Sequence, residues 1–442
     1  MYGNMRVFST VEHAHMSEER SVMSTANDAK IIGVDDHVSV ARAIPLGIQH
    51  MMSMFGATVL VPVLTGLDPN LAIMCSGIGT IVYLLVTRNK IPSYLGSSFA
   101  FISPIIVATA ATGSLHTALS GVVVAGCVFL AVAGIIKIAG TNWLNTLLPP
   151  VLVASVMVVI GVGLSAAAAR MALLGPDSKF AAVSACIAGI TLLAAVIFSG
   201  QKGIIGTLPV LLAILVGYVA SAFVGLINFQ PVVDAPWIGL PPIQTPHFDP
   251  HAIVLIAPVA IVVVIEHIGH LLAVGEIVGK DYRAMLPQSL AGDGISTCIS
   301  GFLGGPPTTT YAENIGVMSV THVFATQVFW YAAGFALIVG GFCPKVAAFI
   351  GTIPVPVMGG VSLLLFGLIA SNGLRMFVTN KVDFDDNRNL MIASVVIILG
   401  VGMETAQINI PLGGYTLPGM ATSTLIGIVL NAVLPRHAKD KA

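Results

Sequence analysis

The feature that most constrains this chain is a series of long apolar runs interrupted only by isolated charges. A helix that crosses a bilayer needs about 20 predominantly apolar residues, so several runs have room for one crossing. Only 9% of the residues are charged, against about 25% in soluble domains. The sequence therefore predicts an all-α protein that crosses a membrane many times. Examples of the runs are residues 43–67, 91–136, 203–233, 314–344 and 405–435.

Charges, prolines and glycines between the apolar runs mark where the crossings begin and end, and they predict fourteen membrane segments. The net charge is −1 and no basic face or tail stands out, so nothing indicates a nucleic-acid partner. The predicted segments are residues 43–66, 69–87, 94–111, 116–137, 146–168, 180–200, 204–228, 251–275, 286–303, 307–321, 325–343, 354–374, 389–404 and 415–434.

Lysine and arginine test this count, because they concentrate in the cytoplasmic loops of membrane proteins. With the N-terminus inside, all 19 fall on the cytoplasmic side except Arg170, Lys179 and Lys345. We therefore expect both termini in the cytoplasm. Residues 1–42 mix both charge signs and lack the apolar stretch of a signal peptide. They are expected to form a disordered cytoplasmic tail, and residues 435–442 a second cytoplasmic tail.

Two segments differ from ordinary spanning helices. The third contains "PSYLGSSFAFISP" and the tenth is "PPTTTYAENIGVMSVT". Both open with proline and with β-branched, hydroxyl or aromatic residues, so each predicts a short strand followed by a half helix.

The same two segments indicate an internal repeat. Superposing Ser97-Ser98-Phe99-Ala100 on Thr309-Thr310-Tyr311-Ala312 gives an offset of 212 residues, and Gln49-His50 matches Glu266-His267 at an offset of 217. Two similar offsets predict two units of seven segments, residues 43–228 and 251–434. Because seven is odd, the second unit is inverted. Inverted repeats with broken helices are typical of secondary transporters, whose substrate site lies at the breaks.

Few ionisable residues fall inside the predicted segments of the second unit, and such residues are functional candidates because their burial is costly. Glu266 and His270 lie four residues apart on one helix face, so a carboxylate and an imidazole form a plausible proton-coupling unit. His267 points away from that face, where a packing contact is its simpler role. Glu313 stands near the start of the tenth segment's half helix, where free N–H groups favour an acceptor. Asp293, in "LAGDGIST", has the pattern of a cap or turn.

A metal site is the alternative for the stretch "EHIGH". Its order is E-H-x-x-H, not the H-E-x-x-H of zinc proteases, and no further ligand cluster completes a shell. The five cysteines lie unpaired in apolar segments and predict small buried residues, without a disulfide or metal. We expect no metal and no cofactor.

Carboxylates accept hydrogen bonds and backbone N–H groups donate them. Two glutamates and two strand ends therefore suit a small planar ligand with alternating N–H donors and C=O acceptors, such as uracil or an oxopurine. Sugars and amino acids fit less well, since no further polar or cationic cluster accompanies these residues.

Several motifs carry a family resemblance. With them, from about Pro45 to Pro435, the chain resembles the nucleobase/ascorbate transporter (nucleobase:cation symporter-2) family, and within it the bacterial uracil and pyrimidine permeases. The motifs are "MFGATVLVPVLTGLDPN", "IPSYLGSSFAFISP", "EHIGHL", "TTYAENIGVM" and "IPVPVMGGVSLLLFG", in this order.

The resemblance implies a seven-plus-seven arrangement, a core and a gate domain, commonly a homodimer, and proton-coupled import across the bacterial inner membrane. It implies that Glu266 binds the base, that His270 supports it in proton coupling, and that Glu313 accepts from another N–H of the base. Backbone contacts to the base are implied for Phe99 and Ala312. Residues expected beside these are His50, Ser98, Tyr311, Asn314 and His267.

The preferred base stays open. Uracil-type members have glutamate at the position of Glu313, whereas many xanthine and urate carriers have glutamine, so Glu313 favours a pyrimidine. Two residues depart from the family pattern: Ala312 replaces a glycine of some uracil permeases, and His322 stands where Arg, Lys or Gly is usual. A permease for xanthine, guanine or urate is therefore the alternative. An anion exchanger of the same architecture is less favoured, and an enzyme least, because no nucleophile and base pair or phosphate loop is present.

Overall fold

The computed structural model describes residues 31–412 and 415–435. It is built almost wholly of helices, with two short antiparallel strand pairs. The helices are α2 (Val40–Ser53), α3 (Phe55–Thr65), α4 (Pro69–Val86), η1 (Phe99–Phe101), α5 (Ile102–Thr112), α6 (Leu115–Ala139), α7 (Asn142–Leu147), α8 (Pro150–Gly163), α9 (Ser165–Leu173), α10 (Ala182–Ser199), α11 (Ile204–Thr207), α12 (Pro209–Phe223), α13 (Gln230–Asp234), α14 (Pro250–Ile256), α15 (Val259–Val278), η2 (Arg283–Met285), α16 (Leu286–Leu303), α17 (Ala312–Thr321), α18 (Thr326–Phe342), α19 (Pro344–Gly351), α20 (Val355–Thr379), α21 (Asn387–Ala406) and α22 (Gly419–Val433). The strands are β1 (Leu95–Ser97), β2 (Thr308–Thr310), β3 (Ile410–Leu412) and β4 (Tyr415–Leu417).

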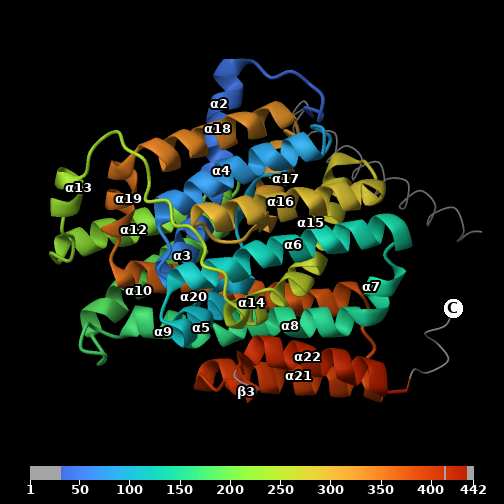
Figure 1. Cartoon of the computed structure of the whole chain (residues 1–442). Helices are drawn as coiled ribbons and strands as arrows, with labels where there is room; N and C mark the ends of the chain where they lie inside the picture. The colour runs from blue at the N-terminus through green and yellow to red at the C-terminus, as the bar shows by residue number, and fades with distance from the viewer. Residues whose placement is uncertain (1–30, 413–414, 436–442) are drawn as a thin grey trace, which may run out of the picture.

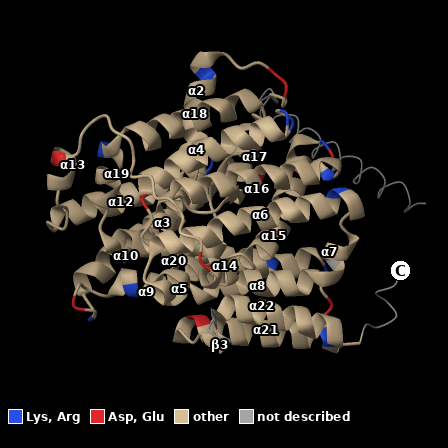
Figure 2. Ribbon diagram, in the orientation of Figure 1, with Lys and Arg blue, Asp and Glu red and all other residues tan. Residues whose placement is uncertain are grey.

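The helices are long and apolar enough for a membrane protein. Among the described residues, eight spans meet the length and composition of a crossing, and the pair α18 and α19, bent by 82°, would make a ninth. Each of the fourteen predicted segments includes one or more helices or parts of them, and the third, tenth and fourteenth also include a strand. Several of these are short or, like α16, rich in hydroxyl residues, so the count of fourteen crossings stays a prediction. Figure 2 shows the charged residues mostly at helix ends and in connecting loops.

Two layers of helices make up the molecule. Helices α4, α6, α16 and α18 pack together in one layer, and α8, α10, α20 and α21 in the other. In Figure 1 the first layer lies above the second, and α22 lies against α21 at the lower edge. The strands β1 and β2 lie between elements of the first layer, close to α4 and α16.

Glycines let the helices of the first layer approach closely, as is usual where lipid gives no hydrophobic drive for helix association. A Cβ on Gly77 of α4 would lie 2.6 Å from the carbonyl oxygen of Ala333 in α18. A Cβ on Gly126 of α6 would lie 2.6 Å from Sγ of Cys298 in α16. A side chain at either position would force apart two of the helices that surround the strands.

The two interrupted segments have the strand and helix that the sequence predicted. Strand β1 precedes η1 and α5, and strand β2 precedes α17. The strands pair antiparallel, with Leu95 opposite Thr310 and Ser97 opposite Thr308. One extended piece from each half of the chain therefore meets the other.

Hydroxyl groups from two neighbouring helices satisfy the outer edges of these strands. Ser76 of α4 donates to the carbonyl of Leu95 at 2.6 Å, and Thr80 accepts from its N–H at 2.9 Å. On the other side, Thr297 of α16 donates to the carbonyl of Thr308 at 2.9 Å. Backbone groups at membrane depth need such partners, which explains why α4 and α16 carry hydroxyl residues at these positions.

The segment before α2 is packed against the body of the protein. The N–H of Ile32 donates to the carbonyl of His322 at 3.0 Å, and the N–H of Phe324 donates back to Ile32 at 2.8 Å. Ile32, Val34 and Val38 are buried. This part of the predicted tail is therefore docked and not disordered, while residues 1–30 and 436–442 lie outside the described part.

Two further features differ from the sequence predictions. Strands β3 and β4 form a hairpin between α21 and α22 that was not predicted, although the Gly413-Gly414 pair between them is a hairpin signal. Only Cys75 of the five cysteines is buried, and all five are free thiols. Their expected burial was thus wrong for the other four.

Candidate functional site

The site is built around the place where β1 and β2 pair, which we call the strand crossing. A Cβ on Gly96 would lie 2.7 Å from Cε of Met54 and 3.2 Å from Cε2 of Tyr311, so only glycine fits there without a shift. The hydroxyl of Tyr311 donates to the carbonyl of Ser97. Sequence and packing together therefore fix the two strand ends beside each other.

A cavity of about 70 Å³ opens directly beyond this crossing. It brings together all five residues predicted to contact the substrate, Phe99, Glu266, His270, Ala312 and Glu313. Ser98 and Tyr311 also line it. The Oγ atom of Ser98 has no hydrogen-bond partner within the described residues, which leaves this hydroxyl available to a ligand.

Glu266 and His270 of α15 face the cavity from the same side of their helix, as their spacing predicted. In one respect the structure differs from the predicted Glu266–His270 pair. Nδ1 of His270 hydrogen-bonds with Oγ1 of Thr310 at 3.2 Å and not with Glu266. Thr310 belongs to β2. The imidazole is thus tied to the strand, and the carboxylate of Glu266 is left facing the cavity.

Glu313 lies in the first turn of α17, which Ala312 begins. Tyr311 precedes the helix without a side-chain cap, so the first N–H groups of the helix lack a capping side chain and face the same region as the carboxylate. Ala312 is exposed in the cavity wall. The chain therefore presents both a strong acceptor and backbone donors at one helix start.

His267 belongs to a buried network behind the cavity. Its Nδ1 lies 2.8 Å from Oδ2 of Asp293, and its Nε2 lies 2.8 Å from Oγ of Ser289. The Ser289 hydroxyl continues to the Tyr83 hydroxyl at 2.6 Å, and Thr309 donates to Asp293 at 3.0 Å. Asp293 lies inside α16 and is neither a cap nor a turn, which corrects the sequence interpretation. Buried acids need such partners, and they join this network to β2.

His50 and Asn314 lie behind the cavity and do not line it. His50 is fully buried, with its ring 4.6 Å from that of Phe329, and neither ring nitrogen has a hydrogen-bond partner among the described residues. Asn314 donates to Sδ of Met54 at 3.5 Å. Asn314 therefore lies on the buried side of α17, and His50 packs against α18.

The second layer completes the cavity with residues that the sequence did not single out. An apolar side chain in an apolar span gives no indication in the sequence that it lines a cavity. Only Asn372, a polar residue in "LIASNGLR", departs from that pattern. These residues are Met157 of α8 and Leu365, Leu368, Ile369 and Asn372 of α20.

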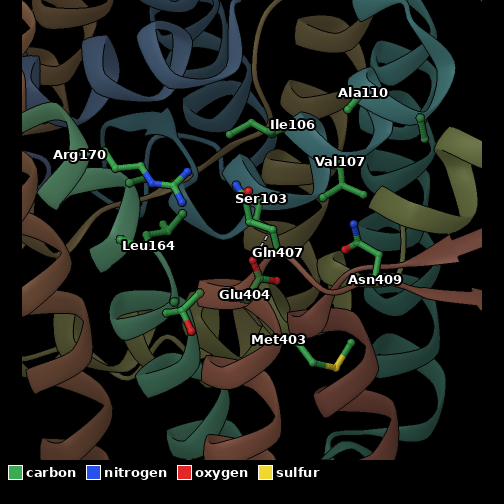
Figure 3. Close-up of a pocket in the computed structure, with 15 residues that line it drawn as sticks. Ser103, Ile106, Val107, Ala110, Leu164, Arg170, Met403, Glu404, Gln407 and Asn409 are labelled. Atoms are coloured by element: carbon green, nitrogen blue, oxygen red, sulfur yellow. Dashed lines mark hydrogen bonds between the residues drawn. The ribbon is translucent and has the colours of Figure 1, made fainter. Parts of the chain in front are cut away.

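A larger cavity of about 520 Å³ lies between α5, α8, α9 and the end of α21. Figure 3 shows Arg170 extending toward its middle and Glu404 hydrogen-bonded to Ser103. A small space lined by Phe99, Ser103, Ile160 and Glu404 separates it from the first cavity. Within the described residues, no group of three or more His, Cys, Asp or Glu side chains could hold a metal ion.

Solved structures share this fold. The transmembrane domain of a cyanobacterial bicarbonate transporter, BicA, matches with a TM-score of 0.64 at 16% identity, over 86% of this chain and all of that one. A murine Solute Carrier 26 family member A9 anion transporter, solved in the inward-facing state, matches with a TM-score of 0.69 at 9% identity, over 90% of this chain and 69% of that one. At these identities the likeness concerns the fold alone.

Sequence relatives cover nearly the whole chain. The uracil permease of Bacillus caldolyticus is 45% identical over 92% of this chain and 95% of its own length. That of Escherichia coli (strain K12) is 43% identical over 91% and 94%. The model of a family described as "Permease family" matches residues 41–408. The chain therefore belongs to this permease family, the nucleobase/ascorbate transporter family that its motifs resemble, and is a multi-pass membrane transporter and not an enzyme.

Proposed function

We propose that the protein imports uracil or a closely related pyrimidine base by proton symport and alternating access. The observation that carries this proposal is the cavity beside the strand crossing, where Glu266, Glu313 and two strand ends face one space. The relatives named uracil permeases, at 43–45% identity, support the choice of base.

The chemistry of the cavity suits a flat base. Uracil has two ring N–H donors and two carbonyl acceptors. In our proposal Glu266 and Glu313 accept from the N–H groups, and the backbone N–H groups at the starts of η1 and α17 donate to the carbonyls. The ring of Phe99 provides an aromatic face, and Ser98 an additional hydroxyl. A ligand that lacked these groups would leave the carboxylates buried without partners.

Proton coupling is assigned to Glu266 and His270. Both line the cavity, and His270 contacts the strand that carries Thr310. A proton taken up at this pair would thus change the hydrogen bonds at the substrate site itself. Uptake of radiolabelled uracil into cells or proteoliposomes, with and without an imposed pH gradient, tests this. Uptake that persists unchanged after the gradient is collapsed would rule out the coupling.

The inverted repeat of seven plus seven segments is supported by how the helices pair. In that repeat α4 corresponds to α16 and α6 to α18, so the contact of α4 with α18 has its counterpart in that of α16 with α6. The contacts of α10 with α20 and of α21 with α8 form a second such pair. We assign residues 43–228 and 251–434 to the two units.

Alternating access requires two bodies that move against each other. We assign α2–α6 and α14–α18 to the core domain, and α8–α12 and α20–α22 to the gate domain. The cavity lies between them and runs along α20 from Leu365 to the exposed Asn372. With the N-terminus inside, this direction leads toward the cytoplasm. The structure therefore represents the inward-facing state in our proposal.

Orientation, membrane and assembly complete the proposal. The distribution of Lys and Arg supports cytoplasmic termini, and the bacterial relatives support the inner membrane. Arg170 and the larger cavity then lie on the external side. A homodimer follows from the resemblance, and the oligomeric state of the purified protein in detergent would test it.

Two other substrates are weighed against uracil. A purine is the first, because Ala312 and His322 depart from the uracil-type pattern. Competition by each unlabelled base decides, and stronger inhibition by xanthine than by uracil would favour the purine. An inorganic anion is the second, because the fold matches anion and bicarbonate transporters. An anion would meet the carboxylate of Glu313 at the start of α17, and like charges repel at such a distance.

A further inference from the structure

We propose that Ser103 and Glu404 form the external gate of the substrate route, a contact between the core and gate domains that must break before the substrate cavity opens to the outside. The proposal rests on alternating access as described above. It does not depend on which base is carried.

The contact joins elements of the two domains. Oγ of Ser103, in α5 of the core domain, donates to Oε2 of Glu404 at 2.6 Å. The other carboxylate oxygen, Oε1, accepts from the backbone N–H of Met420 at 2.8 Å. Met420 lies at the start of α22, so Glu404 is fixed to the gate domain by one oxygen and to the core domain by the other.

Of the hydrogen bonds between the Glu404 carboxylate and Ser103 and Met420, only the one to Ser103 joins the two domains. Glu404 in α21 and Met420 in α22 belong to the same domain, so their hydrogen bond persists when the domains separate. Ser103 leaves with α5, and its bond to Oε2 is the one that breaks. No ion pair of Glu404 within 4.0 Å occurs among the described residues, and Arg170 lines the same cavity. The opened carboxylate would therefore face a cavity that is lined by the positively charged Arg170.

The contact also lies on the route between the two cavities. Ser103 and Glu404 line the larger external cavity and, on their other side, the small space bounded by Phe99. Phe99 in turn lines the substrate cavity, and its ring meets that of Phe366 in α20 edge-on at 6.1 Å. A base that moved from the external cavity to Glu313 would pass Ser103 and Glu404 first and Phe99 next.

The helix opposite leaves room for this carboxylate. A Cβ on Gly163 would lie 3.0 Å from Cβ and 3.2 Å from Cγ of Glu404. Gly163 is the last residue of α8, so the absence of a side chain there lets Glu404 reach across to α5. The gate thus depends on three elements that the chain brings together from distant positions.

Accessibility of a cysteine behind the gate tests the proposal. Ile160 lines the small space and is 6% exposed. In cells that express Ile160→Cys, we expect a membrane-impermeant thiol reagent added outside to react slowly. Adding Ser103→Ala or Glu404→Gln should raise that rate several-fold. Each rate is corrected with the same variant that retains Ile160, because Cys127 and Cys186 are exposed.

Matched variants separate gating from general loosening. Ser103→Thr keeps the hydroxyl and should leave the rate unchanged, and so should Val107→Ala, which lines the external cavity without a hydrogen bond to Glu404. Val159→Cys, fully buried beside the same space, replaces Ile160→Cys if that variant does not reach the membrane. Equal labelling rates with and without Ser103→Ala, at equal amounts of membrane protein, would overturn the proposal. The proposal would also be overturned if Ser103→Ala made Ile160→Cys react faster only with reagent on the cytoplasmic side.

Uptake by the same variants keeps this test distinct from that of the substrate. Faster labelling of Ser103→Ala, together with a parent protein that transports no uracil, would support the gate and count against uracil. A Ser103→Ala protein that transports uracil and labels at the parent's rate would support uracil transport and rule out the proposed gate. Where transport is retained, we expect Ser103→Ala to lower the maximal rate more than it changes KM, because it alters the balance of states and not the site.

Discussion

The Nδ1 atom of His267 lies 2.8 Å from Oδ2 of Asp293, and both side chains are only 1% exposed. Together with Thr309, which lines the substrate cavity, this pair anchors β2 from behind, so the position of the cavity depends on a buried hydrogen-bonded network. Removing one partner of such a buried pair leaves the other unsatisfied.

Asp293→Ala should therefore destabilise the protein and abolish uptake, because His267 and Thr309 lose their common acceptor. We expect a loss of about 1–3 kcal/mol in unfolding free energy. Thermal unfolding in detergent measures it. Asp177→Ala, in an exposed loop, is the control and should shift stability by less than about 0.5 kcal/mol. An Asp293→Ala protein as stable as this control would show that the network is dispensable.

Glu313→Ala should weaken uracil binding markedly. A base N–H would lose its acceptor in a desolvated cavity, at a cost of about 1–3 kcal/mol or more, which corresponds to a roughly 5- to 150-fold weaker Kd. Calorimetry on the purified protein measures this. Glu276→Gln, at the exposed end of α15 and outside the cavity, should bind as the parent does. Unchanged affinity of Glu313→Ala would mean that the site lies elsewhere.

Ala312→Gly should widen the range of bases that the site accepts. The methyl group of Ala312 forms part of the cavity wall at the start of α17, and its removal gives space next to Glu313. We expect unlabelled xanthine to compete more strongly with uracil uptake in this variant than in the parent, by several-fold. An identical competition profile would show that Ala312 does not limit the size of the base.

Gly96→Ala should disturb the strand crossing. The new Cβ would lie 2.7 Å from Cε of Met54 and 3.2 Å from the Tyr311 ring, so both side chains must move, at about 1–3 kcal/mol. Uptake should fall because Tyr311 directly precedes Ala312. Gly316→Ala, which has no atom within 4 Å of its added Cβ, is the matched control. Equal melting temperatures for the two variants would contradict the close crossing.

The sequence predicts much of this arrangement because its signals are local. Proline and β-branched residues in an apolar chain are enough to predict both strand and half-helix segments, and the spacing of Glu266 and His270 places them on one face. The charges of Glu266 and Glu313 stand out because burial of an acid in a membrane is costly.

What the sequence does not predict depends on distant contacts. Asp293 precedes a glycine in a turn-like pattern, and only its meeting with His267 shows that it is a buried acceptor inside α16. Glu404 lies in the last turn of α21, and no local sequence feature indicates that Ser103 is its partner. The docking of residues 32–38 likewise depends on His322, whose φ of 52° turns the chain after α17. A left-handed φ suits glycine, which is one of the three residues (Arg, Lys or Gly) expected at this position from the family resemblance.

The pairing of β1 with β2 has a consequence for how the protein is made. Ser97 leaves the ribosome roughly 200 residues before its partner Thr308, so the first strand enters the bilayer while its mate does not yet exist. During that interval Ser76 and Thr80 of α4 are the groups that can hold the backbone of Leu95. These two hydroxyls hold only the outer edge of β1, so its inner edge waits for β2 without a partner. Loss of the hydroxyls would leave both edges unpaired during synthesis and should reduce the yield of inserted protein before it affects any transport step.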